Sequence, residues 1–167
     1  MAHTLEQFSA ACRRVLTADP GVAGRQKVCR LVQDVLKDEA FVAKHLDDDV
    51  PERKILYEDP DLGFCILAHV YTGAKSSTPH DHGPSWAIYG QARGETMMSD
   101  FAPVAPAEET KPGKVRHVRT YALSPGMAHL YNEGDLHAPK REATTKLIRI
   151  EGRNLDKIRR FGYEEVV

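Results

Sequence analysis

Residues 77–84 read STPHDHGP and place two histidines, His80 and His82, one residue apart. Alternate residues of a β-strand point to the same face of the sheet, so an extended backbone here aims both imidazoles at one point. Imidazole is a ligand suited to Fe, Zn, Ni or Cu. A third histidine, His137 in the segment GDLHAP at 134–139, is placed to complete the set. The sequence therefore predicts a metal site with His80, His82 and His137 as ligands.

The surroundings of this pair strengthen the prediction. The apolar run at 62–71 precedes it, the strand-like run at 86–90 follows it, and glycine and proline punctuate both sides. A single histidine is most often a surface residue or a satisfied core residue, and a histidine pair in a loop also arises by chance. A metal-free barrel with structural histidines therefore stays open as a weaker alternative.

The chain changes texture near residue 50. Residues 4–46 carry apolar side chains at helical spacing, which predicts three helices, the first of them after an N-cap at Thr4. From residue 53 onward short apolar or alternating runs are separated by Gly, Pro, Asp and Asn, which favours an antiparallel sandwich or barrel. The runs that predict strands are 53–57, 63–71, 86–91, 94–101, 115–123, 127–131 and 144–151.

Two further segments carry weaker predictions. Residues 102–114 are polar and rich in proline, which predicts a mobile loop, and residues 154–160 predict a final short helix. We expect one domain, in which a helical segment at 1–50 packs on a barrel at 51–167.

Composition excludes several classes of function. The chain has 167 residues, a net charge of −1, 41% hydrophobic and 28% charged residues, as in an ordinary globular domain. There is no basic excess for nucleic acid, no apolar stretch of the roughly 18 residues that a membrane span needs, and no leader pattern at the N-terminus. Three cysteines without CxxC spacing indicate free thiols in a reducing compartment. We therefore expect a cytoplasmic protein with no nucleic-acid or membrane partner.

Two short motifs contain the three histidines: His80-x-His82 is followed by Gly90 and Gly94, and Gly134-x-x-His137 comes about 55 residues later. In these motifs the sequence resembles the cupin superfamily. The resemblance implies a mainly β fold, the cupin jelly-roll or double-stranded β-helix barrel, with a metal inside it and the N-terminal helices packed on it.

One cupin ligand is missing from the pattern. The first motif of cupins usually carries a glutamate four or five residues after the second histidine, and Trp86 and Ala87 occupy those positions. The resemblance therefore implies a cage of three histidines without a carboxylate.

Three-histidine cupins with leading helices are typical of the thiol dioxygenases, that is, cysteine dioxygenase and 3-mercaptopropionate dioxygenase. The layout is similar over most of the chain. In that family an arginine just before the first long strand binds the substrate carboxylate. Arg53 or Lys54 stands there, and the sequence leaves open which of them faces the pocket.

The chain departs from the thiol dioxygenases in two places. The histidine and tyrosine of their Ser-His-Tyr relay are absent from residues 146–154, and Ala87 stands where some of them carry a cross-linking cysteine. The resemblance thus implies a relative of cysteine dioxygenase and not that enzyme itself. It gives no residue a catalytic role.

A neutral cage of three histidines leaves a divalent metal with up to three open positions. That suits Fe(II), which can hold an anionic substrate together with O₂. We therefore expect an Fe(II) dioxygenase for a small anionic molecule, a thiol carboxylate among the candidates. The same ligands suit Zn, Ni or Mn, so a Zn or Ni hydrolase or isomerase and a non-catalytic metal sensor stay open. A homodimer is compatible with this class.

Aromatic residues near the motif are further candidates for the pocket. In a regular strand Trp86 shares the inward face with His82 and forms either an apolar wall of the pocket or part of an ordinary core, whereas Tyr89 points outward. His69 and Tyr71 share a face one strand earlier and line either the pocket or the helix contact. We predict Tyr71, Trp86 and one of Arg53 and Lys54 as substrate-binding residues.

Several polar residues keep two interpretations. Asp81 is a turn residue or supports the ligands, and His129 is a less favoured alternative ligand. The further candidates for binding an anion, each more often a surface residue, are Arg93, Lys146 and Arg149.

Overall fold

The computed structural model describes residues 3–167. Residues 1 and 2 belong to the predicted helical segment and to the N-terminus inspected for a leader pattern, and they lie outside the described residues. Three helices come first: α1 (Leu5–Ala18), α2 (Val22–Leu36) and α3 (Glu39–His45). The Thr4 hydroxyl accepts a hydrogen bond from the Gln7 amide, and the Gln7 side chain accepts one from the Thr4 amide, both at 3.1 Å. This reciprocal cap confirms the predicted start of the first helix.

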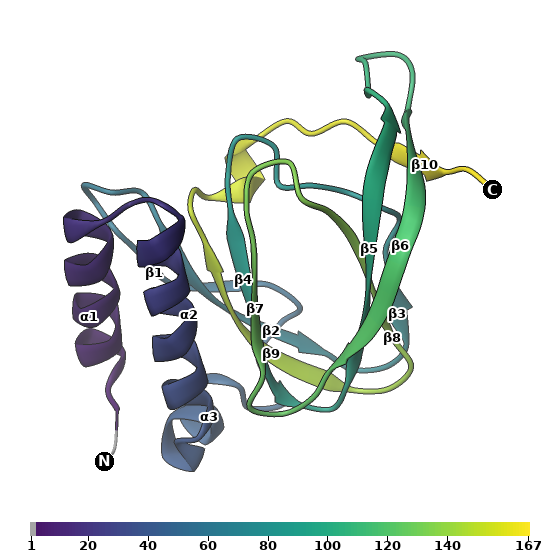
Figure 1. Ribbon diagram of the computed structural model, residues 1–167. Helices are drawn as coiled ribbons and strands as arrows, with labels where there is room; N and C mark the ends of the chain where they lie inside the picture. Colours follow the sequence, from purple (N-terminus) through teal and green to yellow (C-terminus); the bar gives the residue numbers. More distant parts are fainter. Residues whose placement is uncertain (1–2) are drawn as a thin grey trace.

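Strands follow to the end of the described chain and form two five-stranded sheets (Figure 1). Their bounds are β1 (Lys54–Glu58), β2 (Cys65–Tyr71), β3 (Lys75–Ser76), β4 (Ala87–Arg93), β5 (Thr96–Ala105), β6 (Gly113–Leu123), β7 (Ala128–Tyr131), β8 (Leu136–Arg141), β9 (Thr145–Glu151) and β10 (Tyr163–Glu165).

The strand order is that of a jelly roll. One sheet runs β1-β2-β9-β4-β7 and the other runs β10-β6-β5-β8-β3. From β2 to β9 the chain therefore changes sheet at each connection except the hairpin that joins β5 to β6. The three helices lie together on the outer side of the sheet that contains β4 and β9 (Figure 1). The predicted fold, a jelly-roll barrel with N-terminal helices packed on it, is confirmed.

One apolar core joins the helices to the first sheet. Val32 and Leu36 of α2 are buried in the same cluster as Ile88 of β4 and Ile148 of β9. A smaller cluster, which contains Tyr89, lies inside the barrel. Strand β4 therefore separates two environments, with Ile88 and Ala92 in the core beneath the helices and Tyr89 in the barrel.

The prediction of a loop over residues 102–114 was wrong at both ends of the segment. Strand β5 continues to Ala105 and β6 begins at Gly113, so most of this segment is a hairpin that projects beyond the barrel (Figure 1). Past Phe101 strand β5 pairs with β6 alone, and the register shifts between Pro103 and Ala105. A proline is tolerated at such a position, because one side of the strand has no partner strand and the ladder on the other side is irregular.

Other elements also differ from prediction. Strand β8, which carries His137, and the short strands β3 and β10 were not predicted, and the final helix is one 3-10 turn (Leu155–Lys157). Within residues 3–167, no helix has the length and apolar character that crossing a membrane would require.

Candidate metal centre

The backbone brings His80 and His137 together directly. The amide of each donates to the carbonyl oxygen of the other at 2.9 Å, which ties the loop before β4 to strand β8. His82 follows two residues later and is fully buried. One ring nitrogen from each of His80, His82 and His137 lies within 4.8 Å of the others. The three histidines predicted as ligands are thus gathered in one cluster that could hold a metal ion.

Backbone carbonyls fix the orientation of two of these rings. His80 Nδ1 lies 2.9 Å from the Thr78 carbonyl oxygen, and His137 Nδ1 lies 3.0 Å from the Asp135 carbonyl oxygen. Each Nδ1 donates its hydrogen, so the Nε2 of each ring carries the free lone pair. This is the arrangement by which proteins orient histidines that bind metals.

The histidines are neutral nitrogen donors. Burial lowers the pKa of His80 to about 4 and lowers the pKa of His82 and of His137 well below the ordinary value. His82 Nδ1 is buried and has no hydrogen-bond partner among the described residues. Three uncharged imidazole donors in one buried cluster fit a divalent transition metal.

Tyr89 also belongs to this cluster, although the sequence analysis predicted that it points outward. Its hydroxyl oxygen lies 3.1 Å from His82 Nε2 and 3.2 Å from His137 Nε2. The predicted outward orientation of Tyr89 was wrong, because its side chain is buried inside the barrel.

The prediction for Trp86 was wrong in the opposite direction, because Trp86 was expected to face inward. Its side chain lies in the core between the helices and the sheet, with the Arg25 guanidinium 5.4 Å from the ring centroid. A Cβ on Gly152 would lie 2.5 Å from Trp86 Nε1, so the glycine makes room for the indole. The predicted inward face shared with His82, and with it the expected apolar wall of the metal pocket, is corrected.

The turn after His82 explains both errors. The Ser85 amide donates to the His82 carbonyl oxygen at 3.1 Å, and Gly83 has φ of +59°. The chain is therefore not extended between His82 and β4, and alternation cannot be counted through it. Gly83 and Pro84 were the signal that a turn intervenes.

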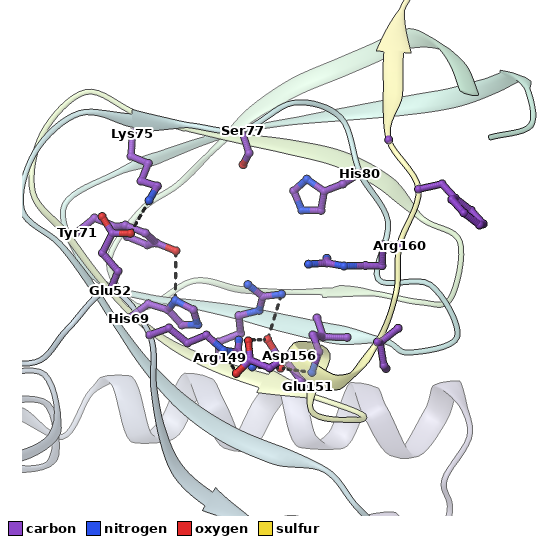
Figure 2. A pocket seen from close by; sticks show the side chains of 15 residues that line it. Glu52, His69, Tyr71, Lys75, Ser77, His80, Arg149, Glu151, Asp156 and Arg160 are labelled. Carbon is purple, nitrogen blue, oxygen red and sulfur yellow. Dashed lines mark hydrogen bonds and ion pairs between the residues drawn. The ribbon is translucent and has the colours of Figure 1, made fainter. Parts of the chain in front are cut away.

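A pocket of about 640 Å³ opens next to His80 and is named here the His80 pocket (Figure 2). Among its lining residues are His69 and Tyr71 of β2, whose ring nitrogen Nδ1 and hydroxyl lie 3.2 Å apart. Of the two alternatives left open for these residues, lining the pocket or contacting the helices, the structure supports the pocket. The C-terminal segment closes another side with Ile158, Arg160 and Phe161.

The structure separates Arg53 from Lys54. Arg53 lines the His80 pocket, whereas Lys54 is exposed on β1 and is not among the lining residues. The Arg53 guanidinium is already paired: it donates to both carboxylate oxygens of Glu151 at 2.7 and 2.9 Å, and to Asp156 at 3.0 Å.

Arg149 and Arg160 are the other arginines of the pocket. Arg149 NH2 lies 3.3 Å from the buried Glu151 carboxylate, and its guanidinium carbon lies 4.6 Å from the ring centroid of Tyr89. Arg160 extends into the hollow beside His80 and donates to the Asp81 carbonyl oxygen at 3.2 Å (Figure 2). Among the described residues, Arg160 makes no ion pair, and the sequence reasoning did not single it out.

The remaining candidates lie elsewhere. Asp81 accepts from the Gly83 amide at 3.0 Å, as a turn residue does. Arg93 pairs with Glu39, and Lys146 lies 2.7 Å from Asp48. His129 lies outside the three-histidine group, at a second cavity lined by Asp100, Arg119 and Tyr131.

No protein-family model matches the chain, and no curated protein matches its sequence. Solved structures that it resembles include a cupin superfamily protein from Desulfitobacterium hafniense, with 11% identity, a TM-score of 0.44, and coverage of 65% of this chain and 82% of that one. A cupin-2 domain containing protein from Shewanella frigidimarina has 12% identity, a TM-score of 0.45, and coverage of 71% and 96%. KdgF from Halomonas sp. has 18% identity, a TM-score of 0.45, and coverage of 67% and 91%. With scores this low, the fold assignment rests on the strand order above.

Proposed function

We propose that this protein is a cupin-type, three-histidine Fe(II) dioxygenase that oxidises a small anionic molecule, a thiol carboxylate among the candidates. The observation that carries the proposal is the three-histidine cluster, in which His80 also lines a large pocket. This pocket holds Arg160, which makes no ion pair within residues 3–167. A resident Fe(II), held by these three histidines, would supply the activation of O₂ toward the substrate.

The residues around the cluster would each contribute a distinct part. His80, His82 and His137 hold the metal. Tyr89 and the apolar barrel interior limit the access of water from the inner side. Arg160 faces the substrate side of the cluster and is available for an anionic group, because no carboxylate neutralises it among the described residues.

The roles expected of Arg53 and Tyr71 change with these contacts. Both carboxylate oxygens of Glu151 engage Arg53, so Arg53 would hold Glu151, which in turn pairs with Arg149, rather than bind the substrate carboxylate itself. Tyr71 lines the pocket, and its hydroxyl contacts His69. Because it lies on the pocket wall, its side chain is placed to contact substrate. We further propose that the protein works in the cytoplasm, since Cys12, Cys29 and Cys65 are all buried free thiols.

The metal assignment and the reaction are tested together with His82→Ala. Removing one of three ligands should abolish iron binding and, with it, the oxygen uptake that a panel of thiol carboxylates and diketones elicits from the iron-loaded protein. The measurements are elemental analysis and an oxygen electrode, with His3→Ala as the control for loss of an imidazole remote from the cluster.

Two outcomes would redirect the proposal. Oxygen uptake that survives His82→Ala would contradict it. Stoichiometric zinc or nickel without oxygen uptake, in protein purified without added metal, would favour a hydrolase, an isomerase or a non-catalytic sensor built on the same ligands.

A further inference from the structure

The Tyr89 hydroxyl contacts the metal-binding side of the histidine rings. His137 donates from Nδ1 to the Asp135 carbonyl oxygen, so its Nε2 is the nitrogen free to bind a metal. Tyr89 lies 3.2 Å from that Nε2 and 3.1 Å from His82 Nε2. A residue that merely supports a ligand contacts the ring nitrogen that faces away from the metal. Tyr89 instead lies where the ligands converge.

The two distances agree with a shared metal ion. Two donor atoms that each lie about 2.1 Å from one ion are about 3.0 Å apart at a right angle and about 3.4 Å apart at a tetrahedral angle. The separations between the Tyr89 oxygen and the two nitrogens fall in this range. We propose that Tyr89 is a fourth metal ligand, which binds through its hydroxyl oxygen together with His80, His82 and His137.

Hydrogen bonds alone do not satisfy this group of side chains. A phenol has one hydrogen to donate, and His82 Nδ1 is buried without a partner among the described residues. Whichever nitrogen of the neutral His82 carries the proton, that buried Nδ1 remains unsatisfied. With the His82 proton on Nδ1, His82 Nε2 and His137 Nε2 would both depend on the one phenol hydrogen, whereas a shared metal ion would satisfy both nitrogens.

The position of Tyr89 in the fold suits a ligand. Its ring is held between the Arg149 guanidinium, 4.6 Å from the centroid, and the Tyr131 ring, 5.5 Å away and edge-on. Arg149 is in turn held by the buried Glu151 carboxylate. A fixed positive charge over the ring stabilises the electron density that an oxygen ligand shares with a metal. An oxygen donor from β4 would thus replace the glutamate that Trp86 and Ala87 do not supply.

The inference rests on the metal centre of the proposed function and does not depend on the oxygenase reaction. The test is to load the protein with Fe(II) without oxygen, oxidise the bound iron to Fe(III) with ferricyanide, remove the oxidant and record the visible spectrum. A phenolate on Fe(III) gives a charge-transfer band in the visible range that imidazole ligands do not give. The iron content is measured on the same samples.

Tyr89→Phe should lose this band, and Tyr131→Phe is the matched control. Tyr131 is also a buried tyrosine beside the cluster, and its ring stacks on His137 with centroids 4.0 Å apart, but its hydroxyl contacts Tyr121. We expect a coloured Fe(III) form for the wild type and for Tyr131→Phe, and a colourless one for Tyr89→Phe.

A colourless wild-type protein with a full complement of Fe(III), or a band that survives in Tyr89→Phe, would overturn the assignment. If Tyr89→Phe fails to fold, resonance Raman spectroscopy of the wild type decides, because phenolate vibrations are enhanced only when tyrosine binds the iron. Wild-type protein that binds no iron would contradict both this inference and the proposed metal centre. Bound iron without oxygen uptake would contradict the oxygenase reaction alone.

Discussion

Gly90 shows at the scale of one residue how closely the helices approach the barrel. It lies in β4 next to Tyr89, and it faces α2 while Tyr89 faces the barrel interior. A Cβ at this position would lie 2.4 Å from Val32 Cγ1 and 2.9 Å from the Ile148 carbonyl oxygen. Glycine is required here for close packing and not for a special backbone conformation.

Gly90→Ala should therefore destabilise the protein by about 1–3 kcal/mol, because the added methyl group overpacks the contact between α2 and the sheet. Urea unfolding followed by circular dichroism measures the change. Gly73→Ala is the control, since no atom lies within 4 Å of a Cβ at that position, and it should leave stability within about 0.5 kcal/mol. Equal stabilities for the two variants would contradict this account of the packing.

At the scale of secondary-structure elements, Asp59 connects α1 to the turn between β1 and β2. Both of its carboxylate oxygens accept from Arg13 Nη1 at 2.8 Å, and one of them also accepts from the Leu62 amide at 2.7 Å. Burial acts to raise the pKa of Asp59, but the hydrogen bonds from Leu62, Arg13 and Asp61 outweigh it and hold the pKa at about 2.

This depressed pKa has a defined effect on stability. An aspartate in the unfolded chain has a pKa of about 3.9, so the folded state gains stability from the ionised Asp59 above that pH. The gain is lost as pH falls from about 4 to about 2. Asp59→Asn should remove this part of the acid dependence and cost about 1–3 kcal/mol at neutral pH. Urea unfolding at a series of pH values measures both effects.

Asp61→Asn is the matched control for that change. Asp61 also contacts Arg13, but 68% of its side chain is exposed, so its removal should change stability by less than about 1 kcal/mol. An acid dependence of Asp59→Asn that equals that of the wild type would show that Asp59 does not carry it.

Across the whole molecule, the His80 pocket is assembled from distant parts of the chain. His80 comes from the loop before β4, Arg53 is the residue before β1, and Arg160 belongs to the segment that leads to β10. Strand β10 pairs in parallel with β6, which carries this segment across the barrel mouth (Figure 1). The cation next to His80 is therefore supplied by tertiary packing.

Arg160→Gln should raise the KM for an anionic substrate about tenfold or more with little loss of iron, because one charge-assisted hydrogen bond contributes about 1.5–3 kcal/mol. Arg159→Gln is the matched control, since Arg159 pairs with Glu109 and does not line the pocket. Steady-state oxygen uptake gives KM and kcat separately. An unchanged KM in Arg160→Gln would remove Arg160 from substrate binding.

Local pattern was enough for the helices, for most of the strands and for the three histidines. The helical spacing at 4–46 and the His80-x-His82 motif depend on short-range periodicity, which the sequence displays directly. Strand β8 was not predicted because Pro139 and the charged Lys140 and Arg141 interrupt its apolar pattern. It is extended in the structure because it pairs with β5.

The sequence by itself determined the three-histidine set and the barrel that surrounds it. Only the tertiary structure decided what faces the cluster. The turn at Gly83 interrupts the alternation of side chains, so Tyr89 and not Trp86 points to the histidines. Arg160 reaches His80 only because β10 pairs with β6, a contact between distant segments that no local pattern encodes. Orientation across a turn and pairing across the chain are set by packing of the whole molecule.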